Sequence, residues 1–66
     1  MKVVFVLTST GEEILEMASN DVAGLLAAGQ GENVTFPQGS YTYDFHTLDH
    51  YIEDDMYQQE LVIYFK

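Results

Sequence analysis

Residues 40–55, with the sequence SYTYDFHTLDHYIEDD, decide how the fold of this chain is interpreted. The stretch opens with aromatic and polar residues in alternation, a period of two that is typical of a half-buried strand. The aromatic positions are Tyr41, Tyr43 and Phe45, and the polar positions are Thr42, Asp44 and His46. We therefore predict that this stretch begins as a strand of an antiparallel sheet.

The second half of the same stretch combines aromatic residues with negative charge. A break is predicted near Thr47, followed by a second short apolar alternation at Tyr51 and Ile52. The carboxylates cluster at its end, at Asp49, Glu53, Asp54 and Asp55. We expect Asp54, Asp55 and Met56 to lie in a turn.

Two further strands are predicted at the ends of the chain. Residues 2–8 and 60–65 each contain an almost unbroken run of β-branched and bulky apolar residues. Such runs are typical of strands that are covered on both faces. We therefore place both strands in the centre of the sheet, close to one another.

Residues 12–18 fit two interpretations. A capping box at Thr10–Glu13 would open a helix with an apolar stripe that continues to Leu26. Against this, the sequence Ser19-Asn20-Asp21 is a new helix-start signal inside that stripe. The first strand also gains its simplest partner if residues 12–18 turn back on it. We favour this hairpin and keep the helix as the alternative.

The middle of the chain predicts one helix and one short strand. The helix is expected over Asp21–Ala28, with Ser19 or Asn20 as its cap and Gly29 ending it in a left-handed conformation. Val34–Phe36 reads as a short strand that Pro37 ends or places at an edge. A turn follows at residues 37–40.

These elements predict a single α+β domain over residues 1–66. The expected architecture is a small antiparallel sheet, made of an N-terminal hairpin and a C-terminal meander of three or four strands. One helix covers one face of this sheet.

Charge is the most unusual property of the composition. Eleven acidic residues accompany two lysines, Lys2 and Lys66, and the formal net charge is −9. Phosphate binding needs cations, so neither nucleic acid nor an anionic membrane is expected as a direct partner. A positively charged protein surface is the natural complement. The alternative is that the charge only keeps the protein soluble.

The sequence contains no recognisable catalytic or cofactor motif, so we expect neither enzyme activity nor a cofactor. His46 and His50 would share one face of a helix, but on a strand they lie ~13 Å apart, too far to share a metal ion. The acids of residues 49–55 lack the glycine and the spacing of a calcium-binding loop. We therefore predict no metal site.

Tyrosine and carboxylate together define the expected contact surface. Tyrosine provides large contact area at low entropic cost. We expect Tyr43 or Tyr41, and Tyr64, in the core, with Tyr51 and Tyr57 more exposed. The predicted partner-binding residues are Asp44, Asp49, Tyr51, Glu53, Asp54, Asp55 and Tyr57, together with Glu12, Glu13 and Glu16.

In its size, its acidity and its lack of catalytic motifs, the whole chain resembles small phage-encoded inhibitors, including anti-CRISPR and DNA-mimic proteins; no motif is shared. The resemblance implies an inhibitor that presents carboxylates to the nucleic-acid-binding surface of another protein, in the cytoplasm of a bacterial host. The alternative is a small homodimeric or adaptor protein whose acidity serves solubility. Its contact would use an apolar edge at Val34–Phe36 or at Val3–Leu7.

Overall fold

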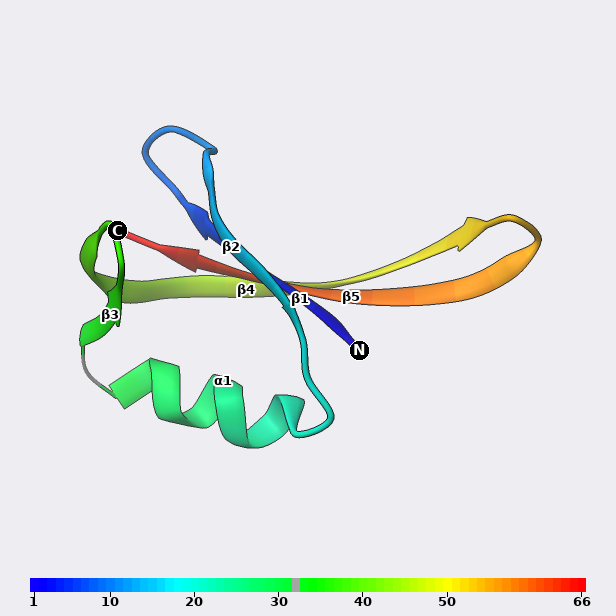
Figure 1. The fold of residues 1–66 in the computed structure, drawn as a ribbon, viewed down its shortest axis with the longest axis horizontal. Coiled ribbons are helices and arrows are strands. Elements are labelled where there is room, and N and C mark those ends of the chain that lie inside the picture. Colours follow the sequence, from blue (N-terminus) through cyan, green and yellow to red (C-terminus); the bar gives the residue numbers. More distant parts are fainter. Residues whose placement is uncertain (32) are drawn as a thin grey trace.

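The computed structural model describes residues 1–31 and 33–66 as one mixed sheet with a single helix (Figure 1). The elements, in chain order, are β1 (Lys2–Leu7), β2 (Glu13–Ala18), α1 (Val22–Gly31), β3 (Asn33–Phe36), β4 (Gly39–Glu53) and β5 (Met56–Phe65). The predicted α+β class is confirmed.

The sheet has the strand order β2-β1-β5-β4-β3. Both terminal strands are central and adjacent, as predicted, and they pair in parallel with Val4 opposite Val62. All other pairs are antiparallel. Val3–Leu7 is therefore not an open edge, and that part of the homodimer interpretation is wrong; β3 does lie at an edge of the sheet.

Residues 13–18 form a strand, so the hairpin interpretation is confirmed. β2 pairs with β1, with Leu15 opposite Phe5. Gly11 adopts a φ of 72° in the connecting turn, a conformation that glycine reaches without steric cost. The turn closes with a hydrogen bond from the Leu7 amide to the Glu12 carbonyl, 2.9 Å long.

Helix α1 begins and ends later than predicted. Asp21 is its cap, because a side-chain oxygen of Asp21 accepts a hydrogen bond from the Gly24 amide at 3.2 Å. Ser19 instead accepts a hydrogen bond from the Asp21 amide and holds the capping residue in place. Gly29 does not terminate the helix, which continues to Gly31. The ten residues of α1 make it too short to cross a membrane, and no helix of the described residues is long and apolar enough to do so.

The hydrophobic core lies between α1 and one face of the sheet. Phe65 is fully buried, with its ring centroid 5.9 Å from that of Phe5 and 5.4 Å from that of Phe36. Leu25 and Leu26 of the helix pack against this aromatic cluster. We call this side of the sheet the helix face and the opposite side the open face.

Strand β4 differs from the prediction in two ways. It runs without interruption for 15 residues, so the expected break near Thr47 is absent. A bulge at Asp44 also shifts the register against β5, and the extra residue moves all later side chains to the other face. Phe45 consequently lies on the open face, stacked on Tyr64 with ring centroids 4.3 Å apart. Tyr64 is therefore not part of the core, whereas Tyr41 and Tyr43 pack against it.

Strand β5 begins at Met56, four positions before the predicted start at Glu60, because the connection from β4 is only two residues long. Asp54 and Asp55 have φ values of 52° and 62°. Positive φ at both central residues is the mark of a type I′ hairpin turn, whose twist matches that of the flanking strands. Met56 is thus a strand residue and not part of the turn.

The β4–β5 hairpin extends beyond the rest of the sheet. The first residue of β1, Lys2, is aligned with Glu60, which is paired with Asp49. Among the described residues, residues 50–53 and 56–59 therefore pair only with each other, and residues 50–59 project from the body in Figure 1. We call these residues the arm.

Candidate functional site

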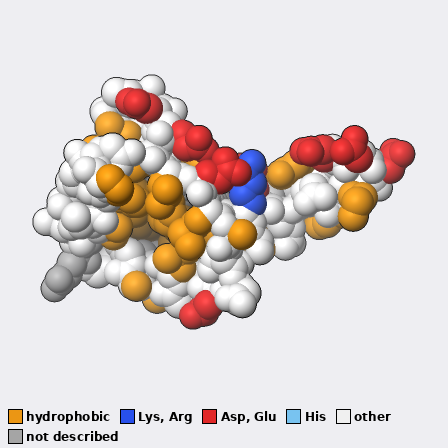
Figure 2. All heavy atoms as spheres, in the orientation of Figure 1, with side chains coloured by type: hydrophobic (Ala, Val, Ile, Leu, Met, Phe, Trp, Pro, Cys, Tyr) orange, Lys and Arg blue, Asp and Glu red, His pale blue; other side chains and the backbone are white. Residues whose placement is uncertain are grey.

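The arm presents two chemically different faces. Cross-strand register places Tyr51 and Glu53 on the open face, in line with Asp49 at the base of the arm. His50, Ile52 and Tyr57 occupy the helix-face side. In Figure 2, acidic side chains follow one side of the arm and hydrophobic side chains lie on the other.

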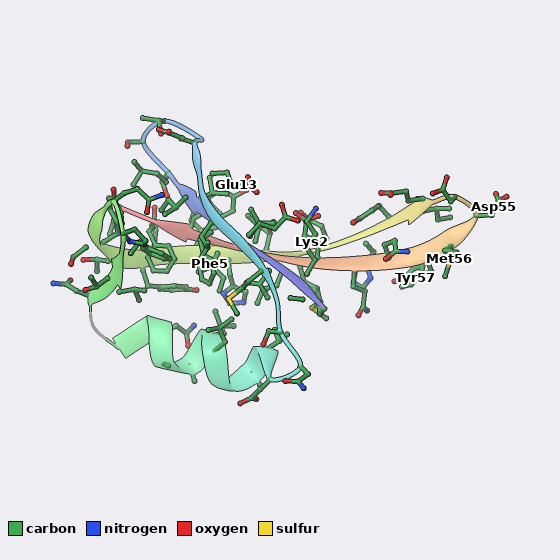
Figure 3. All side chains as sticks on the ribbon, in the orientation of Figure 1. Lys2, Phe5, Glu13, Asp55, Met56 and Tyr57 are labelled. Carbon is green, nitrogen blue, oxygen red and sulfur yellow. The ribbon has the colours of Figure 1, made fainter. Side chains whose placement is uncertain are left out.

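The end of the arm holds its densest negative charge. Glu53, Asp54 and Asp55 are consecutive, and both lysines of the chain lie outside the arm. Asp55 lies at the outer end of the arm, far from Lys2 in Figure 3. Aspartate tolerates the left-handed conformation of the turn better than most residues. The turn therefore displays two carboxylates at the tip of a narrow projection.

Large apolar side chains stand beside these carboxylates. Ile52 is 75% exposed, Tyr57 65% and Met56 64%. Large hydrophobic residues exposed in a group are characteristic of interaction surfaces. Tyr57 was predicted from the sequence as a contact residue, whereas Ile52 and Met56 were not. Their positions close to a two-residue turn are the sequence feature that could have indicated their exposure. A turn this short adds no segment that could cover their side chains.

Tyr57 is held in place although its ring is exposed. Its hydroxyl group is hydrogen-bonded to Nδ1 of His50, and the two ring centroids are 5.5 Å apart. His46 makes a similar contact with the hydroxyl of Tyr43, at 2.6 Å. Each histidine therefore orients a tyrosine on the same side of the sheet. Tyr51, expected to be exposed, is half-buried.

Two predicted carboxylates are engaged within the chain. Glu16 lies 3.3 Å from Nζ of Lys2, and Glu60 lies 3.8 Å from the same atom. The hydrogen bond to Glu16, supported by the charges of Glu16 and Glu60, raises the pKa of Lys2 above its ordinary value. Asp44 accepts a hydrogen bond from the Thr8 hydroxyl at 2.9 Å and lies 4.0 Å from Nζ of Lys66. Glu16 and Asp44 are therefore partly neutralised.

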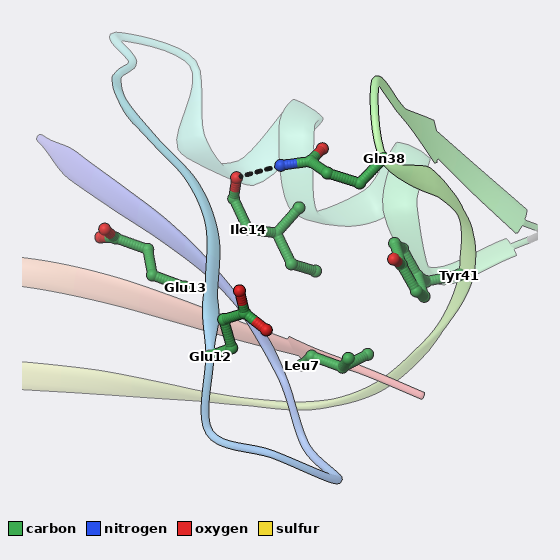
Figure 4. Close-up of a pocket in the computed structure, with 6 residues that line it drawn as sticks. All are labelled: Leu7, Glu12, Glu13, Ile14, Gln38 and Tyr41. Carbon is green, nitrogen blue, oxygen red and sulfur yellow. Dashed lines mark hydrogen bonds between the residues drawn. The ribbon is translucent and has the colours of Figure 1, made fainter.

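Glu12 and Glu13 belong to a separate region at the β1–β2 turn. They border a hollow of about 140 Å³ whose other lining residues are Leu7, Ile14, Gln38 and Tyr41 (Figure 4). Gln38 closes one side by donating a hydrogen bond to the Ile14 carbonyl at 3.0 Å. The hollow is smaller than the ~300–1,000 Å³ of a typical small-molecule site.

The structure therefore divides the predicted contact residues. It brings together Asp49, Tyr51, Glu53, Asp54, Asp55 and Tyr57 on the arm and at its base. It separates them from Glu12, Glu13, Glu16 and Asp44, which lie on the body of the protein. We take the arm as the candidate site.

Comparison of the chain with protein-family models, curated proteins and solved structures finds no match.

Proposed function

We propose that this chain is an acidic protein-binding module, whose arm blocks a positively charged, nucleic-acid-binding surface of another protein. The observation that carries the proposal is the projection of the arm, with carboxylates along one side and the exposed side chains of Ile52 and Tyr57 on the other. A projecting hairpin reaches into a groove that the body of the protein cannot enter.

The carboxylates of the arm supply charge that is complementary to a positively charged partner surface. Asp49 and Glu53 share one face of β4 with Tyr51 between them, and they lie ~13 Å apart, because alternate residues of a strand recur every ~6.6 Å on one face. Asp54 and Asp55 continue the row around the tip. Such a row competes for the lysines and arginines that otherwise hold phosphates. An inhibitor of a CRISPR or restriction system, acting in the bacterial cytoplasm, would work in this way.

The apolar side of the arm supplies buried area. Tyr57 is fixed by His50, so little side-chain freedom is lost when its ring is covered by a partner. Ile52 adds a neighbouring apolar contact on the same face. In this arrangement the carboxylates accelerate association, while Tyr57 and Ile52 slow dissociation.

The test begins with capture of bacterial proteins on the immobilised chain, washed at low and then high salt. A captured protein should bind nucleic acid by itself, lose that binding when the chain is added, and be released by salt. Glu53→Gln combined with Asp55→Asn should abolish the competition. Glu12→Gln combined with Glu13→Gln removes the same charge from the body and should leave it intact. Equal effects of the two pairs, with the fold unchanged, would contradict a role for the arm.

A further inference from the structure

Strand β4 has a long unpaired edge. β3 covers β4 only up to the pair Asn33–Thr42, whereas β4 continues to Glu53. Among the described residues, no strand lies on this side of residues 43–53. Alternate residues of a strand direct their N–H and C=O groups to opposite sides, so half of these residues present unpaired backbone groups.

The other edges of the sheet are less suited to pairing. β3 has four residues and is followed by Pro37, and short edges next to proline resist strand addition. β2 has six residues and contains a bulge opposite Phe5 and Val6. The free part of β4 is thus the longest regular edge of the molecule.

We propose that this edge pairs with the same edge of a second copy, antiparallel, about a two-fold axis at Leu48. An interface of this kind is isologous, because each copy contributes the same residues. Leu48 is the midpoint of residues 43–53. If all of these residues pair, the turn of each copy comes close to the first residue of β3 in the second copy. Leu48 is also the midpoint of Phe45–Tyr51, which lies wholly beyond the bulge at Asp44.

The axis at Leu48 avoids direct contact between like charges. It sets Leu48 against Leu48 of the second copy, and Asp49 against Thr47. A shift of the axis by one residue would set Asp49 against Asp49, and like charges directly opposite one another destabilise a sheet. Like-charge repulsion therefore disfavours a shift of the axis toward the tip of the arm, and the axis at Leu48 is favoured because it pairs the whole of residues 43–53.

Exposed apolar side chains gather around this axis. Leu48 is 50% exposed and Ile52 is on the same side of β4. In this register Leu48 and its cross-strand neighbour Leu61 meet Leu48 and Leu61 of the second copy, which gives one apolar strip across four strands. Ile52 lies opposite residue 44 of the second copy, outside this strip. A domain of this size buries only ~60% of its unfolded surface, so the added burial matters for its stability.

Repulsion between the copies opposes pairing. Each carries a formal charge of −9, and the two Asp49 residues lie diagonally, ~7–8 Å apart. The Debye length is ≈ 8 Å at physiological ionic strength, so salt weakens this repulsion. Self-association should therefore increase with salt, whereas binding to a basic partner should decrease.

The test is sedimentation equilibrium over a wide range of protein concentration, at low and high salt. The wild type should show a monomer–dimer equilibrium that salt shifts toward dimer. Leu48→Glu should weaken dimerisation roughly tenfold, because it puts two carboxylates opposite one another at the axis. Leu15→Glu on β2, at a residue that is 42% exposed, adds the same charge and should leave dimerisation nearly unchanged.

Cross-linking provides a second measurement that does not depend on the glutamate variants. The chain has no cysteine, and opposed residues of a hydrogen-bonded antiparallel pair have Cα atoms ~5.5 Å apart, a distance that suits a disulfide. Leu48→Cys should therefore oxidise to a linked dimer, and Leu15→Cys should do so much less. A wild type that stays monomeric at all salt concentrations, or equal cross-linking of both variants, would overturn the proposal. In the dimer each arm lies along β4 of the second copy and no longer projects, so the dimer and the complex with a basic partner are alternative states. Inhibition of a basic partner is measured separately, so either proposal can fail alone.

Discussion

The Nζ atom of Lys2 lies 3.3 Å from a carboxylate oxygen of Glu16, on the neighbouring edge strand β2. This ion pair connects the edge of the sheet to its central strand. Glu60 of β5 approaches the same ammonium group from the other side. Lys2 thus bridges three strands in a protein that otherwise carries one more lysine.

The first prediction concerns alkaline pH. The pKa of Lys2 is raised from its ordinary value of 10.5, so the folded state holds this proton more tightly than the unfolded state. The resulting stabilisation is fully present below that ordinary value and is lost as the pH rises through the folded-state pKa. Lys2→Met should therefore be less stable than wild type at neutral pH, and the difference should disappear in strong alkali.

Urea denaturation at a series of pH values measures this difference. Lys66→Met is the matched control, since it removes the same charge from a residue whose ion-pair distance to Asp44 is 4.0 Å. An equal loss of stability in both variants would show that total charge, and not the bridge made by Lys2, is responsible.

The second prediction is that salt stabilises the folded monomer. The net charge of −9 is held closer together in the folded chain than in the unfolded one. Screening this repulsion should raise the melting temperature at neutral pH. Glu53→Gln combined with Asp55→Asn should reduce the slope of melting temperature against salt. A fall in melting temperature on adding modest sodium chloride would contradict this account.

The third prediction concerns the turn of the arm. Both Asp54 and Asp55 adopt positive φ, and Asn-Gly is the preferred pair for this type of turn. Asp54→Asn combined with Asp55→Gly should stabilise the protein by about 1 kcal/mol, a typical gain for an improved turn. Asp54→Val should destabilise it, because a β-branched residue resists positive φ. Thermal or urea unfolding measures both effects, and the reverse order would refute the assigned turn.

The fourth prediction tests the bulge at Asp44. Phe65 is fully buried, whereas Phe45 is 44% exposed on the open face. Phe65→Ala should cost about 3–5 kcal/mol, the usual range for a buried phenylalanine, and should unfold much of the protein. Phe45→Ala should cost only about 1 kcal/mol, mainly through its contact with Tyr64. Comparable losses in the two variants would place Phe45 in the core.

The fifth prediction separates the two faces of the arm in binding kinetics. Once a basic partner is captured, neutralising Glu53 and Asp55 should lower its association rate. Tyr57→Ala should mainly raise its dissociation rate, because the ring supplies buried area. Tyr57→Phe keeps the ring but loses the bond to His50, so its effect should be smaller. Surface plasmon resonance resolves the two rates, and a Tyr57→Ala variant with unchanged dissociation would remove Tyr57 from the interface.

The sequence by itself determined the kinds of elements and their order. Apolar runs near both termini predicted that β1 and β5 lie away from the edges of the sheet, and in the structure each of them has a neighbouring strand on both sides. The second helix-start signal at Ser19 separated β2 from α1, as the structure confirms. The positions of the acidic residues are also read directly from the sequence, so most residues of the candidate site can be predicted without the structure.

Only the tertiary structure decided how long β4 is and on which face of the sheet each of its side chains lies. One bulged residue, Asp44, moved Phe45 from the predicted core face to the open face. Bulges and register depend on hydrogen bonds to a strand that lies far away in the sequence, so local periodicity does not specify them. The same holds for the uninterrupted path of β4 past Thr47, which pairs with Val62 of β5.

The arm is likewise a product of tertiary structure. It exists because β1 begins only at the level of Glu60, while β4 and β5 continue to the turn at Asp54 and Asp55. The sequence does not show that β1 begins opposite Glu60 and leaves the β4–β5 turn uncovered. The register between β1 and β5 is set by packing over the shared core. Because the β4–β5 hairpin extends beyond β1, Ile52 and Tyr57 are exposed, and the acidic residues are divided between the arm and the body.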